Sequence, residues 1–143
     1  MNVLVINGPN LARLDIRDSA IYGDMTYPQL VAHIENAAET HGFKADVRQS
    51  DDEATIIGWL HEAADKKLPV IINPAAFTHY SYAIRDGVEL VKSPVIEVHL
   101  SNPLAREEFR HTSVISGVAN GTIGGFGPNS YVLALIALKA LLA

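Results

Sequence analysis

A glutamate and a histidine stand two positions apart in an otherwise apolar segment, and together they suggest acid chemistry. Glu97 and His99 alternate with apolar residues across residues 94–100. If this segment is a strand covered on both faces, the two side chains point to the same side, because the strand period is two. Buried glutamate and histidine are unfavourable unless they are paired or functional. A carboxylate beside an imidazole favours the imidazolium, which suits a general acid, although a hydrogen-bonded structural histidine is the alternative.

A long polar segment, residues 7–25, follows the apolar run at the start of the chain and carries Asn10, Arg17 and Tyr22. Its glycine, proline and asparagine residues suit a simple turn followed by a solvated loop. A connection of this length in a compact domain is more often a lid or a binding loop. We therefore expect this segment to cover a functional site.

Polar residues also follow the two later apolar runs. Asn73 and His79 come after residues 70–72, where they either line a cleft or belong to an ordinary turn. If they line a cleft, the N-terminus of the helix predicted to follow them favours an anion. Arg106 and Arg110 add two cations after the segment that contains the glutamate and histidine.

Strand and helix patterns alternate along the whole sequence. We expect strands at residues 2–6, 43–49, 70–73, 94–100 and 114–118, and helices that begin near Thr26, Ser50, Thr78 and Asn129. This order predicts an α/β fold, a flavodoxin-like doubly wound five-stranded parallel sheet with helices on both faces, formed by a single domain over residues 1–143. Ligands bind beyond the carboxyl ends of such strands, where the three polar segments meet.

Composition excludes several classes of function. A net charge of −5 argues against nucleic acid as a partner. The 12-residue apolar stretch at residues 132–143 is shorter than the roughly 20 residues that span a bilayer, so no membrane association is expected. The absence of cysteine fits a reducing, cytoplasmic location. The six histidines lack metal-ligand spacing, so no metal site is expected.

Taken together, these segments resemble the type II 3-dehydroquinate dehydratases. The match extends in order over nearly the whole chain: residues 7–11 (Asn-Gly-Pro-Asn-Leu), Arg17 with Tyr22 and Gly23, residues 48–50 (Arg-Gln-Ser), Asn73 through Thr78 and His79, Arg85 and Asp86, residues 94–102 and residues 106–110. The resemblance implies reversible anti elimination of water from 3-dehydroquinate through an enolate, as a step of the shikimate pathway. No redox step occurs in this reaction, so no cofactor is expected.

The resemblance also implies roles for individual residues. Tyr22 would be the base, acting as a phenolate, and Arg17 would stabilise that phenolate. Asn10 would help to stabilise the enolate oxygen. His99 would protonate the departing hydroxyl, with Glu97 orienting its ring.

Substrate contacts are implied for Asn73, His79, Asp86, Leu100, Ser101 and Arg110. Asp86 would reach the site of a neighbouring subunit in a homododecamer of trimers, and Arg106 would be a structural or lid partner. The lid departs from the usual family pattern at Asp15, Asp18 and Ser19, and Tyr80 stands where a small threonine is usual.

The main alternative is a non-catalytic flavodoxin-like module that binds FMN or a nucleotide. Its first loop should be rich in serine, threonine and glycine to wrap phosphate, whereas this loop carries Pro9, Leu11 and Ile16. A receiver-type signalling domain is excluded, because asparagines (Asn7 and Asn73) stand where such a domain needs acidic residues.

Overall fold

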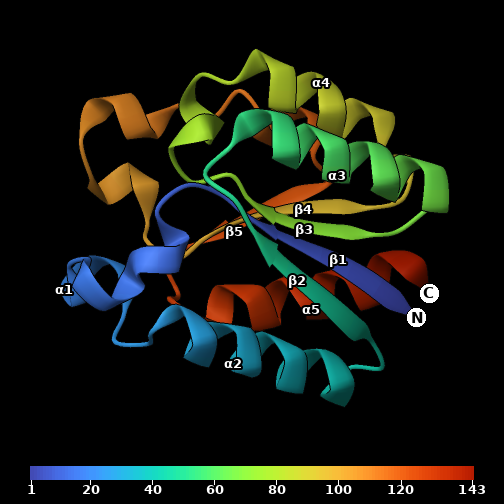
Figure 1. Ribbon diagram of the computed structural model, residues 1–143, viewed down its shortest axis with the longest axis horizontal. Helices are drawn as coiled ribbons and strands as arrows, with labels where there is room; N and C mark the ends of the chain where they lie inside the picture. The colour runs from blue at the N-terminus through green and yellow to red at the C-terminus, as the bar shows by residue number, and fades with distance from the viewer.

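The computed structural model describes all of residues 1–143 and has one parallel sheet at its centre (Figure 1). Its strands are β1 (Asn2–Asn7), β2 (Lys44–Gln49), β3 (Val70–Asn73), β4 (Val95–His99) and β5 (Gly121–Gly124). They pair in the order β2-β1-β3-β4-β5, and every pair is parallel. This order is the flavodoxin-like doubly wound arrangement, so the predicted fold class is confirmed.

Helices cover both faces of the sheet. The helices α2 (Tyr27–Thr40) and α5 (Asn129–Leu142) lie on one face, and α3 (Glu53–Lys66) and α4 (Tyr82–Leu90) lie on the other (Figure 1). The short helix α1 (Ser19–Tyr22) sits beyond the carboxyl ends of the strands. Five 3-10 turns connect these elements: η1 (Leu11–Ile16), η2 (Ala75–His79), η3 (Pro103–Ala105), η4 (Glu108–His111) and η5 (Ser116–Val118). No helix is both long and apolar enough to traverse a lipid bilayer.

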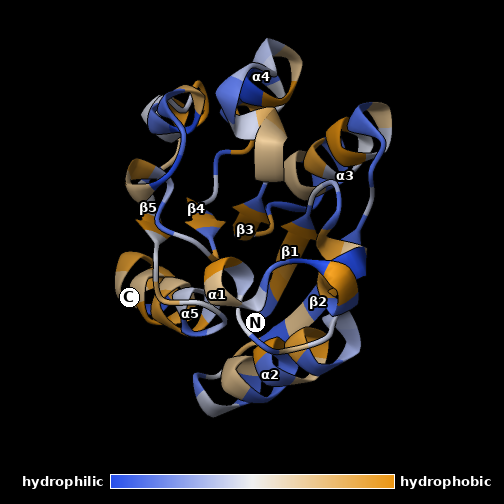
Figure 2. Ribbon diagram, turned by 90° about the vertical axis from the view of Figure 1, so that its left-hand side faces the viewer, coloured by the Kyte–Doolittle hydropathy of each residue, from blue (hydrophilic) through white to orange (hydrophobic).

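The interior strand β1 contributes side chains to both hydrophobic cores. Val3 and Val5 belong to the cluster beneath α2 and α5, whereas Leu4 and Ile6 belong to the cluster beneath α3 and α4. Successive side chains of a strand point to opposite faces, which explains why this run is continuously apolar. Figure 2 shows the same pattern, with apolar strands between helices that are apolar on one side. The covered sheet is thus a rigid platform whose strand ends carry the polar loops.

The prediction of a fifth strand at residues 114–118 is wrong. That segment forms a turn and the 3-10 helix η5, and β5 lies a few residues later, at Gly121–Gly124. The Ser113 hydroxyl accepts hydrogen bonds from the backbone N–H groups of Ile115 and Ser116, which bends the chain. The β-branched side chains in this segment favour an extended strand, but this local turn overrides their preference.

Three local predictions also need correction. Thr78 does not cap α4, because it lies inside η2 and Ser81 is the N-cap. Asp52, not Ser50, caps α3. The long segment after β1, which was expected to be a loop, contains η1 and the helix α1. The capping box of Thr26 and Gln29 at the start of α2 is confirmed.

Candidate active site

A cleft opens at the carboxyl ends of β1, β3 and β4, where the three polar segments of the sequence converge. Nine of the eleven predicted site residues line it: Asn10, Arg17, Tyr22, Asn73, His79, His99, Leu100, Ser101 and Arg110. Arg106, which the sequence suggested only as a structural or lid partner, lines it as well. Glu97 lies behind the cleft wall, and Asp86 lies outside the cleft.

Two guanidinium groups flank the phenol of Tyr22. The Arg106 Nη2 donates a hydrogen bond of 2.7 Å to the Tyr22 hydroxyl oxygen. Arg17 lies over the face of the same ring, with 3.6 Å between its Cζ and the ring centroid. Positive charge at these two positions stabilises a phenolate, and a phenolate is a proton acceptor.

Arg106 ties the loop after β4 to the helix α1. Its Nη1 donates to the Ser101 hydroxyl at 3.2 Å, while its other terminal nitrogen reaches the phenol. Arg17 is placed in the same cluster of cations. Burial lowers the pKa of the Arg17 guanidinium, the Tyr22 phenol opposes this effect, and Arg106 and Arg110 lower that pKa further. The end of the cleft near Tyr22 is therefore strongly electropositive.

Glu97 and His99 lie on the same side of β4, as the strand period predicts. The His99 Nε2 is 2.5 Å from the Glu97 Oε2. A carboxylate can only accept, so Nε2 carries the proton of this bond and Nδ1 is the ring atom left for proton transfer. The carboxylate thereby fixes the orientation and the tautomer of the ring.

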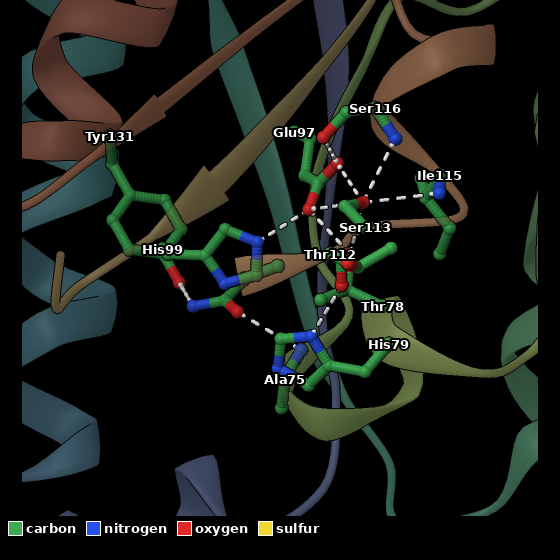
Figure 3. Close-up of polar contacts among 11 residues, drawn as sticks. Ala75, Thr78, His79, Glu97, His99, Thr112, Ser113, Ile115, Ser116 and Tyr131 are labelled. Atoms are coloured by element: carbon green, nitrogen blue, oxygen red, sulfur yellow. Dashed lines mark hydrogen bonds and ion pairs between the residues drawn. The ribbon is translucent and has the colours of Figure 1, made fainter. Parts of the chain in front are cut away.

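Three hydroxyl groups complete the surroundings of Glu97, which is fully buried (Figure 3). Thr78 donates at 2.5 Å, Ser116 at 2.6 Å, and Ser113 at 3.0 Å. Burial by itself would raise the pKa of the Glu97 carboxyl, but the hydrogen bonds from His99, Ser116 and Thr78 hold that pKa below its usual value. The carboxylate is therefore ionised beneath the imidazole.

The sequence did not reveal these hydroxyl groups. The sequence pattern indicates a helix cap at Thr78, Ser116 lies in the segment predicted as a strand, and Ser113 directly precedes that segment. A buried carboxylate needs several donors, so hydroxyl residues in a neighbouring segment were the available signal.

The loop after β1 holds Asn10 in a left-handed conformation, with a φ of 70°. The Asn10 backbone N–H donates to the Asp51 carboxylate at 2.9 Å, and the Gln49 side chain donates to the Gly8 carbonyl at 3.1 Å. Gly8 is required at its position, because a Cβ there would lie 2.6 Å from the Pro74 carbonyl oxygen. The loops after β1 and β3 therefore fit together only with glycine at residue 8.

His79 is held by the segment that follows η4. Its Nδ1 lies 2.8 Å from the Thr112 carbonyl oxygen, and its ring packs edge-on against Phe109 with centroids 5.7 Å apart. A carbonyl oxygen can only accept, so Nδ1 donates and Nε2 is left for a ligand. His79 and Arg110 thus line the cleft from two different segments.

Comparison with known proteins places this chain in a family. The model of the dehydroquinase class II family matches residues 1–139. The 3-dehydroquinate dehydratase of Halalkalibacterium halodurans is 54% identical over 136 residues, which are 95% of this chain and 94% of that protein. The chain belongs to the class II dehydroquinase family. The resemblance seen in the sequence is thereby confirmed.

Two further relatives of the class II dehydroquinase family agree in sequence and in fold. The 3-dehydroquinate dehydratase of Mycobacteroides abscessus is 53% identical over 135 residues, 94% of each chain. The crystal structure of the type II dehydroquinase from Propionibacterium acnes superposes with a TM-score of 0.94 at 48% identity, covering 97% of this chain and 96% of that one. Membership of this family sets aside the alternative of a non-catalytic FMN- or nucleotide-binding module.

The unusual lid residues make local contacts in this class II dehydroquinase. Asp15 pairs with Arg13 at 3.2 Å. Asp18 is the N-cap of α1, and its carboxylate accepts from the Ala20 N–H at 3.0 Å. Since α1 ends at Tyr22, Asp18 helps to shape the segment that carries the proposed base.

Proposed function

We propose that this chain eliminates water from 3-dehydroquinate with Tyr22 as the base and His99 as the acid. Membership of the class II dehydroquinase family makes the chain a 3-dehydroquinate dehydratase, a hydro-lyase. The residue roles are the part that the proposal adds. They are supported above all by the two guanidinium groups at the Tyr22 phenol, one hydrogen-bonded and one stacked.

The first step removes a proton from C2, the carbon beside the ketone. Tyr22 is a weak base as a neutral phenol, so the reaction uses its phenolate. Arg106 stabilises the phenolate by a hydrogen bond and Arg17 by its charge over the ring. The electron pair moves onto the ketone oxygen and forms an enolate, and Asn10, from the start of the same segment after β1, helps to stabilise that oxygen.

In the second step the enolate reforms the ketone, its electron pair makes the C1–C2 double bond, and the C1 hydroxyl leaves as water. His99 donates the proton, from Nδ1, because Nε2 is engaged with Glu97. The ionised Glu97 carboxylate stabilises the imidazolium form that must exist before the transfer. Asn73, Ser101 and the Leu100 backbone hold the substrate carboxylate, and His79 and Arg110 bind the ring hydroxyls.

An ultraviolet assay for the conjugated enone of 3-dehydroshikimate tests this proposal directly. Tyr22→Phe should lower kcat by at least about 10²-fold, the range of general-base catalysis, and still bind substrate. Tyr82→Phe is the matched control, because Tyr82 is 69% exposed and away from the cleft. A Tyr22→Phe enzyme that keeps a tenth of the wild-type kcat contradicts the assignment of the base.

We also propose a homododecamer built of trimers in which Asp86 completes the site of a neighbouring subunit. Asp86 lies on α4, its side chain is 74% exposed, and its only ion-pair partner is Arg85 at 3.7 Å. The helix α5 leaves Leu133, Ile136 and Leu141 exposed by 39% to 50%. These features favour assembly, and the number twelve comes from the family resemblance.

Light scattering tests the assembly. The mass at micromolar concentration should be far above the 15.5 kDa of one chain. Asp86→Ala should weaken assembly and lower activity together, whereas the exposed Asp65→Ala on α3 should change neither. A fully active monomer contradicts both the assembly and the shared site.

A further inference from the structure

A buried phenol links the first and third strands of the sheet beneath the cleft. Tyr131, from the first turn of α5, is completely buried in the core, and Asn7 is equally buried at the end of β1. The Tyr131 hydroxyl donates to the Asn7 Oδ1 at 2.5 Å and accepts from the Asn73 Nδ2 at 3.0 Å. One hydroxyl group thus joins the side chains that end two neighbouring strands, β1 and β3.

The geometry fixes which end of the Asn73 amide is the donor. The Asn73 Oδ1 accepts from the backbone N–H of Ala75 at 3.1 Å, and a backbone N–H can only donate. Nδ2 is therefore the atom that faces Tyr131, and it has two N–H groups, of which the phenol takes one. Asn73 also lines the cleft, so its second N–H is the group available to a ligand.

We propose that Tyr131 is a positioning residue that holds the Asn73 amide with an Nδ2–H toward the cleft, as a donor to an oxygen atom of the bound substrate. This inference rests on the proposed function, in which Asn73 contacts the substrate carboxylate. Tyr131 itself does not line the cleft, and it acts through its hydrogen bond with Asn73.

The surroundings of Tyr131 support a specific role for its hydroxyl. Its neighbours on α5, Ala134, Leu135 and Leu138, are fully buried, so phenylalanine would satisfy packing at this position. Burial raises the pKa of the Tyr131 phenol, and the hydrogen bond from Asn73 lowers it by less. The group therefore stays a neutral hydroxyl, which donates its hydrogen bond to Asn7 and accepts the hydrogen bond from Asn73.

Steady-state kinetics of Tyr131→Phe tests the proposal. Losing one neutral hydrogen bond that orders a substrate contact should raise KM about tenfold and leave kcat within about twofold. Ser130→Ala is the matched control. It removes a buried hydroxyl from the same turn of α5, where Ser130 accepts from the Phe126 N–H and has no contact with Asn73. Its KM should equal that of the wild type, even if its thermal stability falls.

A double-mutant cycle separates positioning from a general loss of structure. If Tyr131 acts only through Asn73, Tyr131→Phe should change KM by less than about twofold when Asn73 is already alanine. The dissociation constant of 3-dehydroquinate, measured by calorimetry in the inactive Tyr22→Phe background, should rise with Tyr131→Phe by the same factor as KM.

The outcomes are distinct. A folded Tyr131→Phe with wild-type KM overturns the inference, as does an equal rise of KM in the Asn73→Ala background. If Tyr131→Phe does not fold, Asn7→Ala keeps the phenol but removes the acceptor that orients it, and it must raise KM in the same direction. Absence of enone formation by the wild-type protein would instead be a failure of the proposed function.

Discussion

Arg106 donates a hydrogen bond of 2.7 Å to the hydroxyl of Tyr22, although the two residues are 84 positions apart in the chain. This bond places the Arg106 guanidinium at the proposed base oxygen, whereas Arg17 lies over the ring face. The resemblance to the family implied that Arg17 activates the base. In the structure both arginines lie where they can stabilise the phenolate, Arg106 through a hydrogen bond and Arg17 through its contact with the ring face.

Removing either arginine charge should therefore lower kcat/KM by different amounts. Arg106→Met should lower kcat/KM by about 10- to 100-fold, because the phenolate loses a hydrogen bond from a charged group. Arg17→Met, which loses the contact with the ring face, should lower it less. Arg13→Met, which removes an exposed guanidinium paired with Asp15, should leave kcat/KM unchanged. A loss of kcat/KM caused by Arg17→Met alone contradicts the contact seen at Arg106.

Glu97 should make stability depend on pH in the acidic range. Its pKa in the folded protein lies below the ordinary value of 4.5, so its carboxylate stabilises the fold above that value. This stabilisation is lost as the pH falls through the folded-state pKa. The difference in Tm between wild type and Glu97→Gln should be large at pH 7 and shrink below about pH 4.5. Glu108→Gln, at an exposed site, should show no such trend. A difference that is the same at pH 7 and pH 3 refutes the ionised state.

A single methyl group at residue 8 should disturb the contact between the loops after β1 and β3. Gly8→Ala places a Cβ 2.6 Å from the Pro74 carbonyl oxygen, so the backbone must shift. The free energy of unfolding should fall by about 1–3 kcal/mol, as measured by denaturant titration. Gly58→Ala, in α3 with no atom within 4 Å of the new Cβ, should instead raise stability by about 0.5–1 kcal/mol. Equal effects at both positions contradict the close approach.

Removing one hydroxyl group that donates to the Glu97 carboxylate should weaken His99 as the proposed acid. It should leave Tyr22, the proposed base, unaffected. Ser116→Ala removes a bond of 2.6 Å and should lower kcat more than it changes KM, since Glu97 orients His99. A reduction of about tenfold corresponds to the loss of one hydrogen bond to a charged group. Ser93→Ala, which loses a surface hydrogen bond to the Lys67 carbonyl, is the control. Wild-type kcat in Ser116→Ala shows that the remaining donors suffice.

The sequence predicted the fold because the pattern of each central element agreed with its position. The continuous apolar run of β1 required a strand covered on both faces, and the capping box at Thr26 and Gln29 marked the start of α2. The strand period was also enough to pair Glu97 with His99. In these places local preference and the three-dimensional structure point the same way.

The missed features depend on contacts between distant segments. β5 is a short strand containing two glycines, at Gly121–Gly124, and it is a strand only because it pairs with β4. The bond from Arg106 to Tyr22 exists because α1 folds over the end of β4. No spacing rule connects residues so far apart, and the resemblance to the family implied only a structural or lid role for Arg106.

The bond between Asn7 and Tyr131 spans 124 positions of the chain, so it can form only late in synthesis. Every residue that lines the cleft has been made once the ribosome passes residue 110. The phenol that links Asn7 to Asn73 is added only later, with the final helix. A nascent chain can therefore contain all of the cleft residues while Asn73 still lacks its partner, so the arrangement beneath the cleft is completed last.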